Sequence, residues 1–412
     1  MIGATTCDEI SVVVRGQVFT GWKSAQIVSG VNQLASQFSL SLTRKLPGGL
    51  SYDRIRPGDE VQVKVGDDLM VTGYVDKAPV SYDGNSITLS VAGRSKCGVL
   101  VDSCCLISRG EKTAAATTAG GEWSGVTTRH DGGANKLAPV KPASQRLDVD
   151  VEKAVREIVE PHGVVLVSTG LGLKAKAVTI SKQQKCFDAI SKLVREHSLV
   201  ATDDEGGNLV LMSMDSPDEG DGALVAALDG VGTNVLSASA AFDYSTVFSA
   251  YEVYGQAKPP KNSKTPTQAT NLGGKSTTKA LGGQTKVLRI FESGNADRRK
   301  MQLRADYERV TREGKAKTVT YKVAGWRTSA GSLWKKGTTV KIKDELLGID
   351  AGDAETWIIG KVAFDMSSSE GRTTTLEVAP LDAYAVQPED WGAEKGGSKS
   401  VGATTEQWKE VK

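Results

Sequence analysis

The sequence predicts a mainly β, α+β protein in which two similar small antiparallel β-barrel modules accompany a small α/β domain. Three observations predict this class. Short segments with alternating apolar residues lie near both ends of the chain, a shared motif occurs once in each region, and two amphipathic helical patterns lie between them. The chain has 412 residues, more than one hydrophobic core ordinarily organises, so several domains are expected.

The bulk composition is that of a soluble globular protein. Hydrophobic residues make up 39% and charged residues 24% of the chain. The formal net charge of +2 provides no broad positive field for phosphates, so direct nucleic-acid binding is not expected. No signal peptide and no long apolar run are visible, so we expect synthesis in the cytoplasm and no membrane insertion.

Residues 1–100 are predicted to form the first β-barrel module. Residues 38–43 alternate with period two, which places Phe38, Leu40 and Leu42 on one face of a strand. Proline and glycine in Arg56-Pro57-Gly58-Asp59 interrupt the strands, and Tyr82-Asp83-Gly84-Asn85 is a hairpin signal. Several short strands at this spacing are typical of a small antiparallel barrel.

The shared motif has three segments in each copy. The interval from Gly73 to Thr88 equals the interval from Gly360 to Thr375, at 15 residues each, whereas the preceding intervals differ by about eight residues. We therefore predict an insertion in one hairpin of the second copy. The segments are Arg56–Val63, Gly73–Val75 and Thr88–Ala92 in the first copy, and Lys336–Ile342, Gly360–Val362 and Thr375–Ala379 in the second. The structural positions predicted from this match are four glycines at matching barrel turns: Gly58, Gly73, Gly337 and Gly360.

The middle of the chain changes character twice. Residues 101–145 are rich in threonine, alanine and glycine, which predicts an insertion or linker. Residues 146–217 are predicted to form the small α/β domain, because Asp150 can cap an amphipathic helix that ends near Pro161 and Gly163. The acidic turn Asp203-Asp204-Glu205 lacks the ligand order of a calcium loop, so a solvated turn is expected.

Residues 218–385 are predicted to form the second β-barrel module. Within them, 256–286 is expected to be a flexible loop and 295–313 a helix. Basic residues cover much of that helix, but acidic residues alternate with them, which favours a solvated face or a protein contact over phosphate binding. Residues 386–412 are predicted to be a polar tail.

The sequence predicts no catalytic, cofactor-binding or metal-binding residues and no cofactor. Five cysteines show no Cys-x-x-Cys spacing and only three histidines are present, so reduced thiols are expected rather than zinc ligands. Gly273-Gly274-Lys275-Ser276 imitates the end of a phosphate loop but lacks its first glycine. A carboxylate pair of the glycosidase type depends on distance in space, so the sequence leaves that alternative open.

An ordered set of motifs resembles the baseplate hub protein of Mu-like contractile-tailed phages, which is related to the hub module of the type VI secretion spike protein. The resemblance covers most of residues 8–385 and excludes the insertion and the tail. The segments that carry it are Val18–Trp22, Arg56–Asp59, Gly73–Val75, Ala92–Lys96, Leu100–Ser103, Gly325–Trp334 and Thr375–Tyr384.

This resemblance implies a non-enzymatic virion protein of the tail baseplate of a contractile phage, or of a tailocin (a headless bacteriocin), assembled in the host cytoplasm. It implies a homotrimer whose six barrels form a pseudo-sixfold ring that adapts the sixfold tail tube to the threefold central spike. The implied partners are the other copies of the chain, the central spike protein, tail tube or tube-initiator proteins and baseplate wedge proteins. DNA is expected to pass through the lumen without specific binding.

Two alternatives remain beside this prediction. A type VI secretion spike base has similar hub modules but continues into a long β-helical spike, whereas this sequence ends 28 residues after Tyr384 without such a pattern. A baseplate-associated cell-wall hydrolase would require a carboxylate pair in a cleft. The structural hub is preferred over both.

Overall fold

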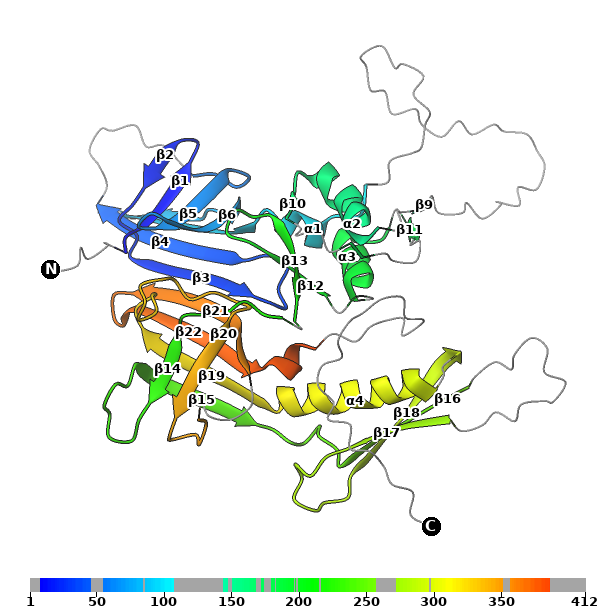
Figure 1. Ribbon diagram of the computed structural model, residues 1–412. Coiled ribbons are helices and arrows are strands. Elements are labelled where there is room, and N and C mark those ends of the chain that lie inside the picture. Colours follow the sequence, from blue (N-terminus) through cyan, green and yellow to red (C-terminus); the bar gives the residue numbers. More distant parts are fainter. Residues whose placement is uncertain are drawn as a thin grey trace, which may run out of the picture.

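The computed structural model places two β-modules side by side, with two smaller units that carry the longer helices on one side of them (Figure 1). The predicted tail 386–412 and most of the predicted linker 101–145 lie outside the described residues. The structure describes residues 8–45, 55–83, 86–106, 144–146, 150–167, 172–173, 179–181, 183–195, 197, 199–214, 216–256, 272–295, 298–350 and 356–385.

In its described residues the first β-module contains eight strands, all of which lie within the predicted region 1–100. Its strands follow the order β3-β4-β8-β6-β5-β1-β2, with β7 paired to β8. Alternation explains the core: Val61, Val63 and Val65 of β5 are buried, whereas the residues between them are less so. The elements are β1 Ile10–Val14, β2 Gln17–Phe19, β3 Ser24–Gly30, β4 Gln37–Lys45, β5 Glu60–Val65, β6 Asp68–Lys77, β7 Val80–Tyr82 and β8 Ser86–Ser95. The helix α1 Gly98–Asp102 follows β8, and its Leu100 packs in the core of the α/β domain.

The second β-module repeats this strand order. Its strands run β15-β19-β22-β21, with β20 paired to β21 and β14 paired in parallel to β20. Five of these strands thus have counterparts in the first β-module, in the order β3, β4, β8, β6 and β5. The strand β14 takes the position of β1 but runs in the opposite direction, since β1 is antiparallel to β5. The elements are β14 Ala223–Ala226, β15 Val235–Phe242, β19 Lys317–Ala324, β20 Thr339–Asp344, β21 Trp357–Ser367, β22 Gly371–Pro380 and the 3-10 helix η2 Leu381–Tyr384.

The two β-modules share one sheet and one core. Strand β21 pairs with β3 as well as with β22, and this ladder joins the modules into a 14-stranded sheet. One hydrophobic cluster contains residues of both, among them Leu40 of the first β-module and Tyr321 of the second. Among the described residues, no pairing closes either module on itself, so barrel closure stays a prediction.

Backbone hydrogen bonds establish which residues of the two β-modules are equivalent. Gly58 N donates to Val75 O at 2.8 Å, and Gly337 N donates to Ile359 O at 2.7 Å. Val75 N in turn donates to Asp59 O, and Ile359 N donates to Thr338 O, each at 3.0 Å. In both cases the acceptor is the residue that follows the glycine. The first segment of the sequence repeat is therefore aligned correctly in space.

For the second and third segments of the repeat, the residues that are equivalent in space are not the ones that the sequence repeat aligns. The ladder between β6 and β8 skips Asp76, and the ladder between β21 and β22 skips Gly360, so these two bulge residues correspond. Gly73 therefore corresponds to Trp357 in space, three residues before Gly360, with which the sequence repeat had aligned it. Thr88 likewise corresponds to Thr373, two residues before the Thr375 of the sequence alignment. The insertion in the second β-module is therefore five residues long, where the sequence predicted about eight. The residue numbers of equivalent positions differ by 279 for Gly58 and Gly337 but by 284 for Val75 and Ile359. Alternating strands offer several similar registers, and only backbone pairing distinguishes them.

The α/β domain follows the predicted pattern closely. Asp150 caps α2, where its Oδ1 accepts a hydrogen bond from Lys153 N at 3.2 Å, and Gly163 with φ of 72° ends the following turn. Its buried residues come mainly from α2, α3, β12 and β13. The elements are β9 Ser144–Arg146, α2 Val151–Val159, the 3-10 helix η1 Glu160–His162, β10 Leu166–Val167, β11 Thr179–Ser181, α3 Cys186–Arg195, β12 Leu199–Asp203 and β13 Leu209–Ser213.

A helix-backed arm extends from the second β-module (Figure 1). It consists of a three-stranded sheet in the order β17-β16-β18 against which α4 packs. The predicted flexible loop 256–286 is wrong in part, since β17 lies within it; a Cβ on Gly274 would lie 2.2 Å from the Met301 backbone, so the glycine permits close packing on α4. The elements are β16 Ala250–Gln256, β17 Leu272–Thr277, β18 Val287–Asn295 and α4 Arg298–Lys315.

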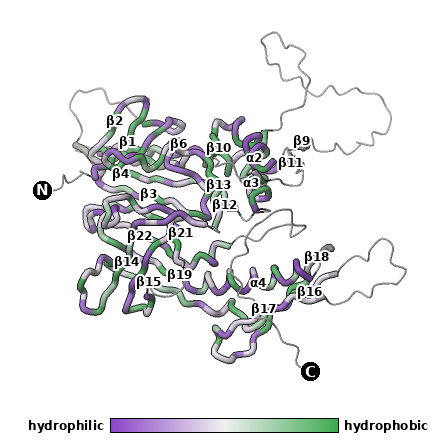
Figure 2. Tube along the Cα trace, viewed as in Figure 1, coloured by the Kyte–Doolittle hydropathy of each residue, from purple (hydrophilic) through white to green (hydrophobic). Residues whose placement is uncertain are grey.

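Hydropathy follows this architecture. Hydrophobic and hydrophilic residues alternate along the strands of both β-modules, as Figure 2 shows. The helices in the described ranges include none with the length and apolar character that a membrane crossing requires.

Candidate functional site

A buried ion pair lies where the two β-modules and the α/β domain meet. Asp203, at the end of β12, has a fully buried side chain that pairs with Lys336 of the second β-module. The same carboxylate accepts hydrogen bonds from Ser36 N at 2.7 Å and Ser36 Oγ at 3.0 Å. Ser36 belongs to the turn between β3 and β4 of the first β-module. One carboxylate thus connects three parts of the chain; we call this cluster of Ser36, Asp203 and Lys336 the junction.

The sequence did not indicate this role. Asp203 was expected in a solvated acidic turn, and that expectation is wrong for Asp203, although Glu205 is exposed. The available signal was the alternation of β12, which continues through Asp203 and places it on the same face as Leu199 and Ala201. A charge at an inward position of a strand requires a partner, and here the partner is distant in sequence.

Further contacts hold the β-modules at a fixed orientation. Arg327 of the second β-module forms ion pairs with Asp8 at 2.8 Å and with Asp68 at 2.7 Å, both in the first β-module. Thr202 Oγ1 donates to Gly30 O or Gln33 O, each at 3.3 Å. These bonds cross between units, so the relative positions of the modules are set by polar contacts as well as by the shared core.

A groove with a volume of about 660 Å³ runs along the junction. Six of its eight charged lining residues pair with one another: Arg327 with Asp68, Lys336 with Asp203, and Lys335 with Glu205 at 3.8 Å. The other two are Asp204, which accepts hydrogen bonds from Asn208, and Asp218. Since most of the charges have ion-pair partners, the groove has the character of a polar seam between domains.

The four predicted glycines divide into two pairs. Gly58 and Gly337 lie in turns with φ of 89° and 77°. Gly73 and Gly360 do not, and this part of the prediction is corrected: Gly73 lies within β6 and Gly360 within β21. Both strand glycines permit close contacts, because an added Cβ would lie 1.9 Å from Arg94 O or 1.6 Å from Tyr384 Oη, respectively.

Replacing Gly337 by valine is expected to destabilise the protein by about 2–4 kcal/mol. A β-branched residue is strained at this positive φ, and its Cβ would also lie 2.6 Å from Met212 Sδ. The measurement is denaturant unfolding, with Gly348→Ala as a control at a positive φ but with nothing within 4 Å of the added Cβ. Equal losses for the two variants would contradict the role assigned to the Met212 contact.

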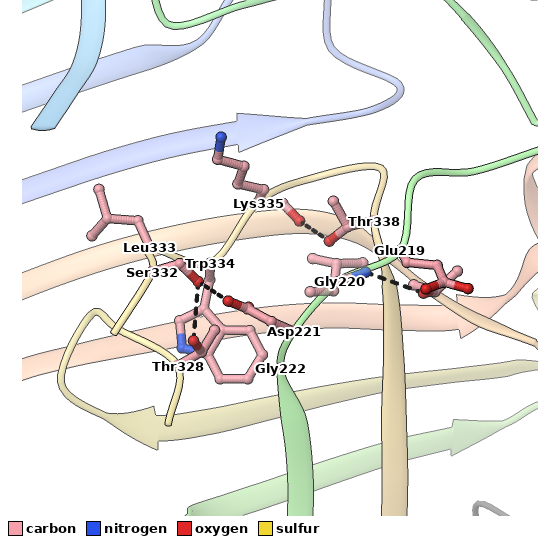
Figure 3. A pocket seen from close by; sticks show the side chains of 12 residues that line it. Glu219, Gly220, Asp221, Gly222, Thr328, Ser332, Leu333, Trp334, Lys335 and Thr338 are labelled. Atoms are coloured by element: carbon pink, nitrogen blue, oxygen red, sulfur yellow. Dashed lines mark hydrogen bonds between the residues drawn. The ribbon is translucent and has the colours of Figure 1, made fainter. Parts of the chain in front are cut away.

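A smaller crevice beside β20 contains two carboxylates (Figure 3). Its volume is about 240 Å³, below the roughly 300–1,000 Å³ of common ligand sites. Figure 3 shows Asp221 directed at Ser332, whose hydroxyl donates to it, and Thr328 beside that serine at 3.0 Å. Asp221, just before β14, thus connects this strand to the loop that precedes β20. The neighbouring Gly222 packs closely there, because an added Cβ would lie 2.2 Å from the Trp334 ring.

Other residues considered from the sequence lie in structural positions. Gly273–Ser276 form part of β17, which is not the geometry of a phosphate loop. Cys186 is buried, with Sγ 3.2 Å from His162 Nε2. Its hydrogen bond with the Cys105 thiol, together with burial, raises the pKa of Cys186. In the described part of the chain, no cluster of three or more histidine, cysteine or acidic residues is arranged to hold a metal.

Three of the seven basic residues of α4 form ion pairs with acidic residues of the same helix. Glu308 forms ion pairs with Arg304 at 2.7 Å and with Arg312 at 2.9 Å, and Arg309 pairs with Glu313 at 3.2 Å. Over residues 304–313 the positive charges therefore lie beside negative ones, which disfavours phosphate binding on that part of the helix.

Two family models match parts of the chain: one covers the first β-module, and the other covers α4 and the strands β19 to β22 of the second β-module. Residues 9–95 match the N-terminal domain of the Mu phage baseplate assembly protein GpP-like family, and residues 297–387 match the fourth domain of the Mu phage baseplate assembly protein GpP. The chain is also 23% identical over 394 residues to the baseplate hub protein gp44 of Escherichia phage Mu, covering 94% of this chain and 92% of that protein.

Solved structures show the same fold. The 43 kDa tail protein of prophage MuSo2 from Shewanella oneidensis has a TM-score of 0.70 and 22% identity, with 92% of this chain and 99% of that chain covered. The Francisella PdpA-VgrG complex matches with a TM-score of 0.51 and 8% identity over 95% of this chain. This chain spans 60% of the matched VgrG-complex chain.

Proposed function

We propose that this chain, a baseplate hub protein of the Mu-like phage type, forms a homotrimer that surrounds the channel of a contractile tail. In this proposal the trimer joins the sixfold tail tube to the threefold central spike. It works as a structural protein of the virion and catalyses no reaction.

The duplicated β-module is the observation that carries this proposal. A threefold assembly can match a sixfold tube only where each chain offers two similar units. Five strands of the second β-module correspond in order and direction to five strands of the first, with a bulge at the same place. The junction supports the proposal further, because a ring of alternating modules requires a fixed angle between them.

The outer partners are assigned by the same reasoning. The sixfold side of the ring contacts tail tube or tube-initiator proteins, and the α/β domain and the arm contact the spike and baseplate wedge proteins. DNA passes through the lumen without specific binding, in keeping with the net charge of +2 and the internal ion pairs of α4.

Native mass measurement tests the proposed trimer. The purified chain alone is expected to give a particle of three times the chain mass of 43.5 kDa, and the complex with its spike is expected to contain three copies of the chain plus the mass of the spike. Averaged electron micrographs of that particle are expected to show six similar lobes. A stable monomer or dimer in both preparations would sink the proposal, and peptidoglycan clearing by the purified protein would overturn its non-enzymatic part.

A further inference from the structure

Within one chain the two β-modules meet through one pair of strands, and among the described residues the two strands equivalent to that pair are not paired with each other. Strand β21 pairs with β3, from Lys361 opposite Gly30 to Met366 opposite Ala25. The equivalent of β3 in the second β-module is β15. The equivalent of this part of β21 in the first β-module is the end of β6 together with β7, because the pairings of β7 with β8 repeat those of β21 with β22.

Both counterpart strands have an open edge. Among the described residues, β7 pairs only with β8 and β15 pairs only with β19. Large side chains on them are exposed, since Tyr82 is 80% and Phe242 is 47% accessible. Open strand edges with exposed aromatic side chains are ready to pair with another strand.

On each of the two open strands, every second residue points its backbone N–H and C=O groups away from the sheet, where they are available to another strand. Pro79 O accepts from Ser90 N and Asp83 N donates to Ser86 O, so residues 79, 81 and 83 face β8 while 78, 80 and 82 face outward. Asp243 N donates to Ala316 O, so residues 239, 241 and 243 face β19 while 238, 240 and 242 face outward.

Transfer of the β3–β21 register to the open edges gives a specific set of pairs. The outward-facing residues Ala78, Val80 and Tyr82 fall opposite Phe242, Ala240 and Ala238, respectively, where hydrogen bonds can form. Pro79, which has no N–H, falls at a position that faces β8 and so interrupts nothing.

We propose that β7 of one copy pairs antiparallel with β15 of the next copy, so that the 14-stranded sheet continues from chain to chain around the ring. This inference rests on the proposed homotrimer and specifies its interface. A second copy is the occupant that the structure supports, because the same two kinds of strand already pair inside each chain in this register.

Side chains across the proposed interface are complementary. Lys77 falls opposite Asp243, both of which are exposed, so opposite charges meet. Ser81 falls opposite Ser239, where the chain itself has the hydrogen-bonded pair Asp365 and Gln26 at 2.9 Å. The aromatic residues Tyr82 and Phe242 each meet an alanine, which leaves space for their rings.

A disulfide test reads this register directly. Ser81 and Ser239 would occupy a pair without hydrogen bonds, whose Cα atoms lie about 4.5 Å apart, within the range for a disulfide. The Ser81→Cys/Ser239→Cys variant is expected to give covalent dimers and trimers, and no larger species, on oxidation. The matched control Ser81→Cys/Ser237→Cys places the thiols diagonally and is expected to cross-link at least about tenfold less.

The outcomes separate this inference from the proposed function. A trimer by native mass that cross-links no more in the Ser239 variant than in the Ser237 control would overturn the strand pairing and leave the trimer standing. A monomer by native mass would overturn both.

Charge reversal provides a second readout that needs no cysteine. Lys77→Glu is expected to weaken association roughly 1.5- to 5-fold at each interface, and Lys77→Glu/Asp243→Lys is expected to restore it. Both residues are exposed, but Asp243 Oδ1 also accepts a hydrogen bond from Ser245 N at 2.8 Å, so denaturant unfolding of each variant checks that the fold is preserved. Equal association of all three proteins would contradict the predicted opposition of Lys77 and Asp243.

Discussion

Replacing Lys336 by alanine is expected to destabilise the protein by about 3–5 kcal/mol, because the fully buried carboxylate of Asp203 would lose its only ion-pair partner among the described residues. Two hydrogen bonds from Ser36 would remain but carry no compensating charge. The measurement is the free energy of unfolding from denaturant titration. Because the lost ion pair joins the α/β domain to the second β-module, a separate early transition of one unit is also expected.

The neighbouring residue provides the matched control. Lys335 is 63% exposed and lies 3.8 Å from Glu205, so Lys335→Ala is expected to cost at most about 0.5 kcal/mol. The double variant Asp203→Asn/Lys336→Met removes both charges and is expected to recover much of the loss. A double variant no more stable than Lys336→Ala would show that packing, rather than the unpaired charge, accounts for the effect.

Replacing Gly73 by alanine is expected to destabilise the protein by about 3 kcal/mol or more, since an added Cβ would lie 1.9 Å from the carbonyl oxygen of Arg94. The obstacle is backbone of the paired strand β8, so relief requires β6 and β8 to separate. Gly93 of β8 is confined in the same way, with an added Cβ 2.1 Å from Tyr74 O. The two strands therefore approach closely just before the bulge at Asp76.

Denaturant unfolding of Gly73→Ala measures this effect. Gly273→Ala is the control, because it also lies in a strand but an added Cβ would come no closer than 3.7 Å to any atom. The control is expected to change stability by less than about 1 kcal/mol. A loss for Gly73→Ala as small as that of the control would mean that the β6–β8 contact is not as close as described.

The strands and helices of the chain could largely be predicted because their signals are local. The alternation of β4 and β5, the Asp150 cap of α2 and the glycine turns at Gly58 and Gly337 depend only on neighbouring residues. The strand β17 was missed because glycine, lysine and serine dominate it, and its formation depends on packing of Gly274 against α4.

The candidate site could not be predicted, because its members are far apart in sequence. Ser36 and Asp203 are separated by 167 residues, and Asp203 and Lys336 by 133. No local pattern marks a lysine as the partner of a particular buried carboxylate. The sequence contains the charged residues of the groove, but it does not indicate which of them form ion pairs with one another.

By itself the sequence determined that the chain carries a β-module twice, because repeated turn motifs and strand periodicity are properties of neighbouring residues. Only the tertiary structure decided how the copies correspond, since Asp76 and Gly360 are equivalent through a bulge in the backbone ladder and not through residue type. It also decided how the copies meet, at β3 and β21, because strand pairing across a sheet depends on which edges packing leaves available.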